Sequence, residues 1–141
     1  MPIEKQLDET MRQIFTHCKT IAVVGLSPKP ERPSHYVSAY LQAQGYRIIP
    51  VNPGPREILG ETAYADLAAV QEPYDWVLCF RRSEKIPAIV ETALSQSTAR
   101  ALWMQVGITH ADAAKACRAA GWWVVENKCA MVEHRRWIDA T

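Results

Sequence analysis

The amino-acid sequence predicts an α/β domain in which helices cover both faces of a mainly parallel sheet. Five short apolar segments rich in β-branched residues have the composition of strands buried on both faces. Segments with helical spacing alternate with them over about 120 residues, and parallel strands require such crossover connections. We therefore expect one Rossmann-like three-layer domain over residues 1–141, with a five-stranded sheet.

The expected strands are bounded by Gly, Pro or polar residues and lie at 20–25, 46–51, 74–80, 100–105 and 122–126. In the second of them, Pro50 lacks an N–H for the ladder, so we place it at the end of the strand. Trp122 and Trp123 are adjacent in the last strand and must face opposite sides of the sheet. If one face is uncovered, a homo-oligomer or an unidentified protein partner becomes possible.

Helices are expected where apolar residues recur every three or four positions, at 1–18, 33–45, 60–71, 83–96 and 109–121. The first is a leading amphipathic helix. Pro33 suits a first helical turn and Gly45 a helix end. Thr109 with Asp112 three residues later predicts a capping box at the start of the last of these helices.

Composition excludes several classes of function. The net charge is +1 and 22% of residues are charged, which does not favour nucleic-acid binding. No segment has the roughly 18 consecutive apolar residues of a membrane span, so we expect no membrane partner and a cytoplasmic location. The four cysteines are widely spaced without a C-x-x-C pair, so we expect reduced thiols and no metal site.

The loops that follow the first three strands carry an excess of positive charge. Ligands of open α/β sheets bind outside the carboxyl ends of the strands. Six cations face three anions there, a net charge of +3: Lys29, Arg32, Arg56, Arg81, Arg82 and Lys85 against Glu31, Glu57 and Glu84. This asymmetry predicts an anionic ligand, although surface loops also collect Lys and Arg for solubility.

The loop `GLSPKPERPS` narrows the choice of ligand. Ser27 and Pro30 stand where a G-x-G-x-x-G fingerprint needs glycines, and Pro30 also breaks the Walker pattern. A Gly turn that leads into a helix N-terminus with free backbone N–H groups still favours a phosphate. Ser27, Ser34, Lys29 and Arg32 can add contacts, so we expect a diphosphate with a further phosphate nearby.

The end of the second strand points to a phosphorylated ribose. NAD sites present an acid there to bind the ribose 2′-hydroxyl, whereas this chain has Asn52 followed by Arg56. NADP and coenzyme A (CoA) both fit.

The segments `VVGLSPKPERPS`, `IIPVNP`, `LGETAYADLAAV`, `VLCFRRSE`, `WMQVGI` and `ENKCAMVEH` resemble the small stand-alone CoA-binding proteins (the YccU-like CoA-binding family) over about residues 10–137. These are similar to the N-terminal CoA-binding domain of the succinyl-CoA synthetase α subunit.

The resemblance implies CoA or acyl-CoA as the ligand and three groups of site residues. The diphosphate would lie against Gly25, Leu26, Ser27, Lys29, Arg32, Pro33 and Ser34. The adenosine end would contact Val51, Asn52, Pro53, Arg56, Phe80, Arg81, Arg82 and Ile86. The pantetheine arm would run toward Met104, Gln105, Gly107, Asn127 and Cys129.

Ligase activity does not carry over, because the synthetase's phosphorylated-histidine domain and its nucleotide-grasp subunit have no counterpart in this sequence. We expect a non-catalytic or regulatory CoA-binding module, with no catalytic residue. Two alternatives stay open: an NADP-dependent oxidoreductase, and an acyl-CoA-handling enzyme that uses Cys129 or His134, with Glu133 beside them.

Overall fold

A computed structural model describes residues 3–96 and 98–140 and confirms the predicted Rossmann-like α/β fold. Its main sheet has five strands in the order β2-β1-β5-β6-β7, and every pair is parallel. The strands are β1 (Thr20–Val24), β2 (Arg47–Val51), β5 (Trp76–Cys79), β6 (Ala101–Met104) and β7 (Trp123–Val125). They match the five predicted segments, trimmed at their ends.

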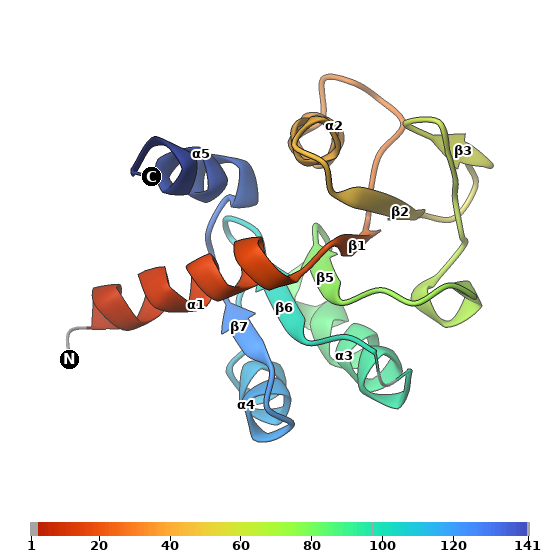
Figure 1. The fold of residues 1–141 in the computed structure, drawn as a ribbon. Coiled ribbons are helices and arrows are strands. Elements are labelled where there is room, and N and C mark those ends of the chain that lie inside the picture. The colour runs from red at the N-terminus through yellow and green to blue at the C-terminus, as the bar shows by residue number, and fades with distance from the viewer. Residues whose placement is uncertain (1–2, 97, 141) are drawn as a thin grey trace.

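Helices cover both faces of the sheet (Figure 1). On one face lie α1 (Ile3–His17), α2 (Pro33–Ala43) and α5 (Ala130–Ala140), and on the other α3 (Ile86–Ser95) and α4 (Ala111–Ala119). Each face has its own apolar cluster. Trp122 packs against the α3–α4 cluster and Trp123 against the α1–α5 cluster, so the predicted opposite orientation of these two side chains is confirmed. No helix in the described ranges is long and apolar enough to span a membrane.

Pro50 pairs with Val23 near the end of β2, which is an edge strand. This position tolerates a residue without an N–H, because only one side of β2 joins the main ladder. On its outer side the Pro50 carbonyl accepts the Tyr64 N–H at 3.0 Å, and the Asn52 N–H donates to the Tyr64 carbonyl at 2.8 Å. The segment around Tyr64 thereby covers the free edge.

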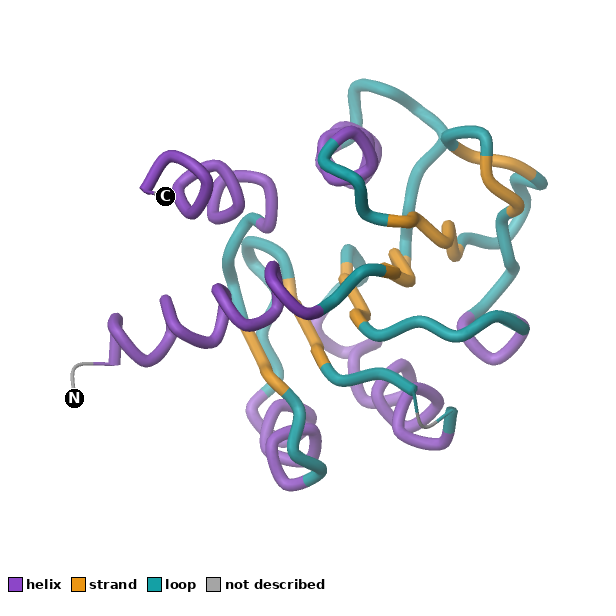
Figure 2. Tube along the Cα trace, viewed as in Figure 1, coloured by secondary structure: helices purple, strands orange, loops and turns teal. Residues whose placement is uncertain are grey.

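The predicted helix at 60–71 is wrong. This region contains a short antiparallel hairpin of β3 (Glu57–Ile58) and β4 (Glu61–Thr62), drawn in orange apart from the main sheet in Figure 2, and one 3-10 turn, η1 (Leu67–Ala69). Leu59 and Gly60 form the hairpin turn with positive φ. Residues 61–64 are extended because Glu61 and Thr62 pair with β3 and Tyr64 pairs with Val51 of β2. Only the part after Asp66, whose side chain accepts the Ala69 N–H at 2.9 Å, becomes helical.

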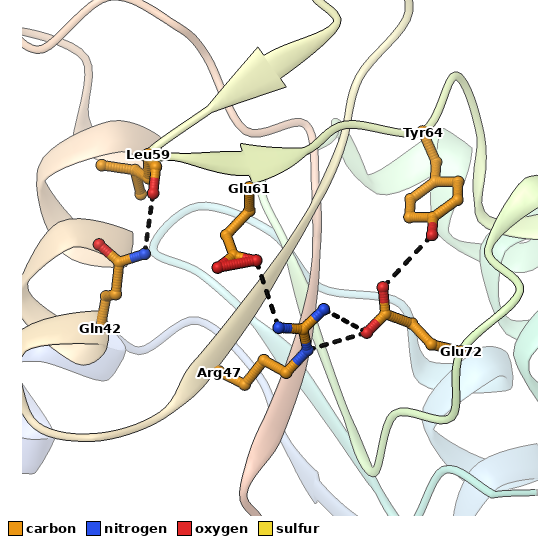
Figure 3. Close-up of polar contacts among 6 residues, drawn as sticks. All are labelled: Gln42, Arg47, Leu59, Glu61, Tyr64 and Glu72. Carbon is orange, nitrogen blue, oxygen red and sulfur yellow. Dashed lines mark hydrogen bonds and ion pairs between the residues drawn. The ribbon is translucent and has the colours of Figure 1, made fainter.

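Side-chain contacts hold this hairpin to the body of the domain (Figure 3). Arg47 of β2 bonds the carboxylates of Glu61 and Glu72, and Glu72 also accepts the Tyr64 hydroxyl at 3.3 Å. These contacts raise the pKa of Arg47, chiefly through its hydrogen bond with Glu72. Gln42 of α2 donates to the Leu59 carbonyl at 3.0 Å. The hairpin is therefore anchored to both β2 and α2.

Two further differences concern helix starts and the C-terminal segment. The N-cap of α4 is His110, whose Nδ1 accepts the Ala113 N–H at 3.1 Å, so the predicted Thr109 cap is wrong. The His110 N–H donates to Glu126 at 2.8 Å, which holds His110 at the cap position.

The helix α5 was not expected from the sequence. A 3-10 turn, η2 (Ser83–Lys85), precedes α3, and Pro87 lies in the first turn of α3, as Pro tolerates.

Asp75 joins three strands at the amino edge of the sheet. Its carboxylate accepts the N–H groups of Lys19 and Thr20 at 3.0 to 3.1 Å. Its carbonyl accepts those of Arg100 and Ala101 at 2.9 and 3.1 Å. One residue thus fixes the starts of β1 and β6 against β5.

We expect Asp75→Ala to lower the free energy of unfolding by about 2 to 3 kcal/mol, because two backbone N–H groups lose a charged acceptor. Urea denaturation measures the change. Glu91→Ala is the matched control, since this exposed carboxylate of α3 has no side-chain contact among the described residues, and it should stay within about 0.5 kcal/mol of wild type. Equal stability of the two variants would contradict the role given to Asp75.

Candidate functional site at the carboxyl edge of the sheet

The carboxyl ends of four strands lie in register. Val51, Val24, Cys79 and Met104 are successive partners across β2, β1, β5 and β6. The residues that follow them, Asn52, Gly25, Phe80 and Gln105, therefore emerge side by side at one edge. Strand order reverses between β1 and β5, because the chain goes from β1 outward to β2 and returns to β5. Such a switch point is where open α/β sheets bind ligands.

Gly25 makes the turn at this point. Its φ is +92°, which disfavours any residue with a Cβ, and a Cβ there would meet the Phe80 backbone and the Arg81 side chain at 3.4 Å. The Gly25 N–H donates to Val51 O at 2.8 Å, and Phe80 N–H to Val24 O at 2.9 Å. The turn is thus held between the two neighbouring strands.

Serine hydroxyls organise the loop between β1 and α2. The buried Ser34 Oγ accepts the Ser27 N–H at 2.9 Å, and Ser27 Oγ accepts the Lys29 N–H at 3.1 Å. At the start of α2, the N–H groups of His35 and Tyr36 both donate to the Arg32 carbonyl. Within the loop, the N–H groups of Ser27, Lys29 and Arg32 are used in this way. Those of Leu26, Glu31 and Ser34 donate to no other described residue, so both backbone N–H groups and side-chain charge are available to an anion.

A pocket of about 650 Å³ opens beside this loop. We call it the first pocket. Nine predicted site residues line it: Gly25, Ser27, Lys29, Arg32, Pro33, Ser34, Phe80, Gln105 and Cys129. Six further residues complete it: Tyr36, Val37, Val106, Ile108, Met131 and Val132. Tyr36 and Val37 could have been inferred from the first turn of the predicted helix, whereas Met131 and Val132 depend on α5, which gave no sequence signal that we recognised.

A second pocket of about 380 Å³ lies on the other side of the Gly25 turn. Predicted residues Val51 and Arg81 line it, together with Lys85. Consecutive residues divide between the two pockets: Val24 and Arg81 line the second, Gly25 and Phe80 the first. The pockets are therefore adjacent across the switch point, and one elongated ligand can occupy both.

Four cations at these pockets carry no compensating partner. Lys29 and Arg32 line the first pocket, and Arg81 and Lys85 the second. None of the four forms an ion pair with another residue in 3–96 or 98–140. In contrast, the predicted site residue Arg82 pairs with Glu84 at 3.2 Å. Asp66 is the acid of the second pocket, and it caps η1. The edge is positively charged, as expected from the sequence.

The other predicted site residues lie outside the two pocket walls. The side chains of Leu26, Ile86 and Met104 are fully buried in the core. Asn52 braces the loop by donating from Nδ2 to Leu26 O at 2.9 Å. Pro53 and Arg56 are exposed on the way to the hairpin. Asn127 accepts the Gly107 N–H at 2.7 Å and joins the loops after β6 and β7.

The sequence profile of a family described as "CoA binding domain" matches residues 19–135. The chain belongs to this CoA-binding domain family. A relative in Bacillus subtilis (strain 168), the uncharacterized protein YneT, is 40% identical over 124 residues, which cover 88% of this chain and 91% of the relative.

Solved structures agree with the assignment. Cell-free ID.343 from Thermus thermophilus is 40% identical with a TM-score of 0.84, over 92% of this chain and 97% of that one. A hypothetical protein from Pyrococcus horikoshii OT3 is 37% identical with a TM-score of 0.87, over 96% and 95% of the two chains. This CoA-binding domain therefore shares its whole architecture with these proteins.

Cys129 and His134 of this CoA-binding domain have different environments. Cys129 is partly exposed in the first pocket, whereas Cys18, Cys79 and Cys117 are buried free thiols. Burial raises the pKa of Cys18 and Cys79 to about 12 and that of Cys117 to about 11. Cys129 is therefore the cysteine placed to meet a ligand.

His134 is 2% exposed and packs among aromatic rings. Its Nδ1 is 2.8 Å from the Tyr40 hydroxyl, and its ring contacts Phe15, Tyr46 and Trp137 edge-on at 5.1 to 5.7 Å between centroids. The neighbouring Glu133 pairs with Arg136. The contacts of His134 join α5 to α1 and α2. Neither His134 nor Glu133 lines the first pocket, so neither supplies a base there.

We expect the stability of the domain to fall with decreasing pH in a way that depends on His134. Desolvation lowers the pKa of His134 in the folded state. Below about pH 6.5, His134 therefore binds a proton in the unfolded chain before it does so in the folded domain. Stability from this group is complete above pH 6.5 and is lost as the pH falls. Urea midpoints between pH 7.5 and 5 should decline less steeply in His134→Gln than in wild type; parallel curves would show that His134 does not titrate with unfolding.

Proposed function

We propose that this protein binds CoA or an acyl-CoA through the loop after β1 and acts as a non-catalytic or regulatory module. The observation that carries this proposal is the adjacency of two pockets at the β1/β5 switch point, each with two cations that form no ion pair within the described part of the chain. CoA is an elongated molecule with a diphosphate at its middle and a phosphate on its ribose. A ligand of this kind needs charge in both pockets, and membership of the CoA-binding domain family supports the same ligand.

The lining residues suggest an orientation for the ligand. The diphosphate would lie over the Gly25 turn near Lys29 and Arg32 of the first pocket. The adenosine and its 3′-phosphate would enter the second pocket, where Arg81 and Lys85 are placed. The pantetheine arm would then follow the first pocket toward Gln105 and Cys129. Gln105 directly follows β6, which lies next to β5 in the sheet, and Cys129 directly precedes α5.

A binding role without turnover is supported by the surroundings of Cys129. A nucleophilic cysteine needs a base within hydrogen-bond reach. His134 is bonded to Tyr40 inside the aromatic cluster, and Glu133 is engaged by Arg136. An NADP-dependent oxidoreductase gains no specific support, since the described lining of the first pocket contains no His, Asp or Glu, and its Tyr36 and Lys29 are both exposed.

Calorimetric titration with CoA, 3′-dephospho-CoA and NADP tests the proposal directly. We expect CoA to bind, and 3′-dephospho-CoA to bind about tenfold or more weakly, because a hydrogen-bonded charge contributes about 1.5 to 3 kcal/mol. Binding of NADP in preference to CoA would overturn the proposal. Equal affinity for CoA and its dephospho form would remove the role given to the second pocket.

We expect Lys29→Ala combined with Arg32→Ala to weaken CoA binding by about tenfold to a hundredfold with little loss of stability, because both side chains are exposed. The matched control is Lys115→Ala with Arg118→Ala, which removes the same charge from the exposed surface of α4. Titration at fixed salt separates a local effect from a change in net charge. Equal weakening in both double variants would show that only net charge matters.

A further inference from the structure

Exposed apolar side chains gather on the rim of the first pocket. Large apolar residues with more than a third of their surface exposed include Tyr36 at 45%, Val106 at 66% and Val132 at 46%, and all three line this pocket. They come from α2, from the turn after β6 and from α5. A rim of this composition is suited to covering an apolar part of a ligand, because burying such surface is favourable.

Gln105 adds a directed hydrogen-bond donor to the same pocket. Its side chain is 5% exposed, and its Oε1 accepts the Ala130 N–H at 2.8 Å. This bond fixes which end of the amide is oxygen. The Nε2 group donates no hydrogen bond to another of the described residues and is not among their fully buried unpaired atoms, so it reaches the surface of the pocket that Gln105 lines. An amide donor at a pocket wall can be satisfied by a carbonyl oxygen of a ligand.

In the orientation proposed above, Gln105 and the apolar rim lie toward the sulfur end of the ligand. Val106 and Gln105 follow β6, which is two strands from β1, or roughly 10 Å from the loop with Lys29 and Arg32. Cys129 lies in the same pocket. A diphosphate at β1 therefore puts Gln105 and Cys129 within reach of the pantetheine arm, and we take its sulfur end to lie beside them.

We propose that the first pocket selects acyl-CoA thioesters with an apolar acyl chain over free CoA, a step that rests on the function proposed above. Gln105 Nε2 donates to the thioester carbonyl, and Tyr36, Val106 and Val132 cover the acyl chain. Free CoA has a thiol at this end, which supplies neither a strong acceptor nor an apolar chain. The acyl thioester then contacts both the Gln105 amide and the apolar rim.

The test compares the affinities of CoA, acetyl-CoA, butyryl-CoA and hexanoyl-CoA for the wild-type protein by calorimetry. A fully buried methylene improves affinity about fourfold, and a methylene that is only partly covered improves it about twofold. Hexanoyl-CoA has four more methylenes than acetyl-CoA, so we expect it to bind about 16-fold more tightly. Binding of CoA with no dependence on chain length would overturn this inference and leave the proposed function intact, whereas failure of all four to bind would overturn the proposed function.

Two variants separate the carbonyl contact from the apolar contact. Gln105→Glu keeps an oxygen for the Ala130 N–H and removes the donor, so it should weaken acyl-CoA binding about threefold to tenfold and free CoA binding by a smaller factor. Val132→Ser should reduce the dependence on chain length. Ile138→Ser is its control, because Ile138 is an exposed apolar residue of the same helix that does not line the pocket.

Alkylation of Cys129 by iodoacetamide supplies a readout that does not depend on a variant. Hexanoyl-CoA should protect Cys129 more strongly than free CoA at equal occupancy, while the three buried cysteines serve as internal controls. Equal protection by both ligands would contradict the placement of the acyl chain. A dimer that Val132→Ser dissociates, together with a flat chain-length series, would assign the rim to self-association and overturn the inference.

Discussion

The turn at Gly25 is the constraint on which both pockets depend. β1 is flanked on both sides by parallel strands, and its chain must leave the sheet between the ends of β2 and β5. The positive φ of Gly25 turns the backbone there, beside Phe80 and Arg81, and this backbone conformation is what disfavours any residue with a Cβ. Phe80 lines one pocket and Arg81, the next residue, lines the other. The two pockets therefore meet at this turn.

The loop after this turn differs from a glycine-rich dinucleotide loop in how it treats its backbone. Ser27 and Ser34 accept N–H groups that a glycine-rich loop would aim at phosphate, and Asn52 braces the Leu26 carbonyl from β2. The loop is thus ordered by its own side chains. Lys29 and Arg32 are carried by this ordered loop, so the function proposed above uses their charge in addition to the remaining backbone donors.

The five strands could be predicted because a strand buried on both faces leaves a continuous apolar run, as in residues 20–25. Contacts distant in sequence decided the parts that could not. The hairpin at 57–62 depends on Arg47, Glu72 and Gln42. The cap at His110 depends on Glu126, which lies in the loop after β7. Nine of the predicted site residues line the first pocket. Those after the first strand followed from the rule that ligands bind at strand ends, and Phe80, Gln105 and Cys129 from the family resemblance. The helix α5 and its pocket residues were missed.

The junction of β6 with α5 connects the structural and the ligand-facing parts of the domain. Gln105 Oε1 accepts the first N–H of α5, at Ala130, so the end of β6 sets where this helix begins. One face of the same helix carries His134 into the aromatic cluster with Phe15 and Tyr40, while Met131 and Val132 border the first pocket. Because His134 fixes how α5 packs on α1 and α2, it also fixes the pocket wall without touching a ligand. The polar residues of α5 therefore shape the first pocket through the position of the helix, whereas Gln105, Cys129 and the apolar rim line it directly.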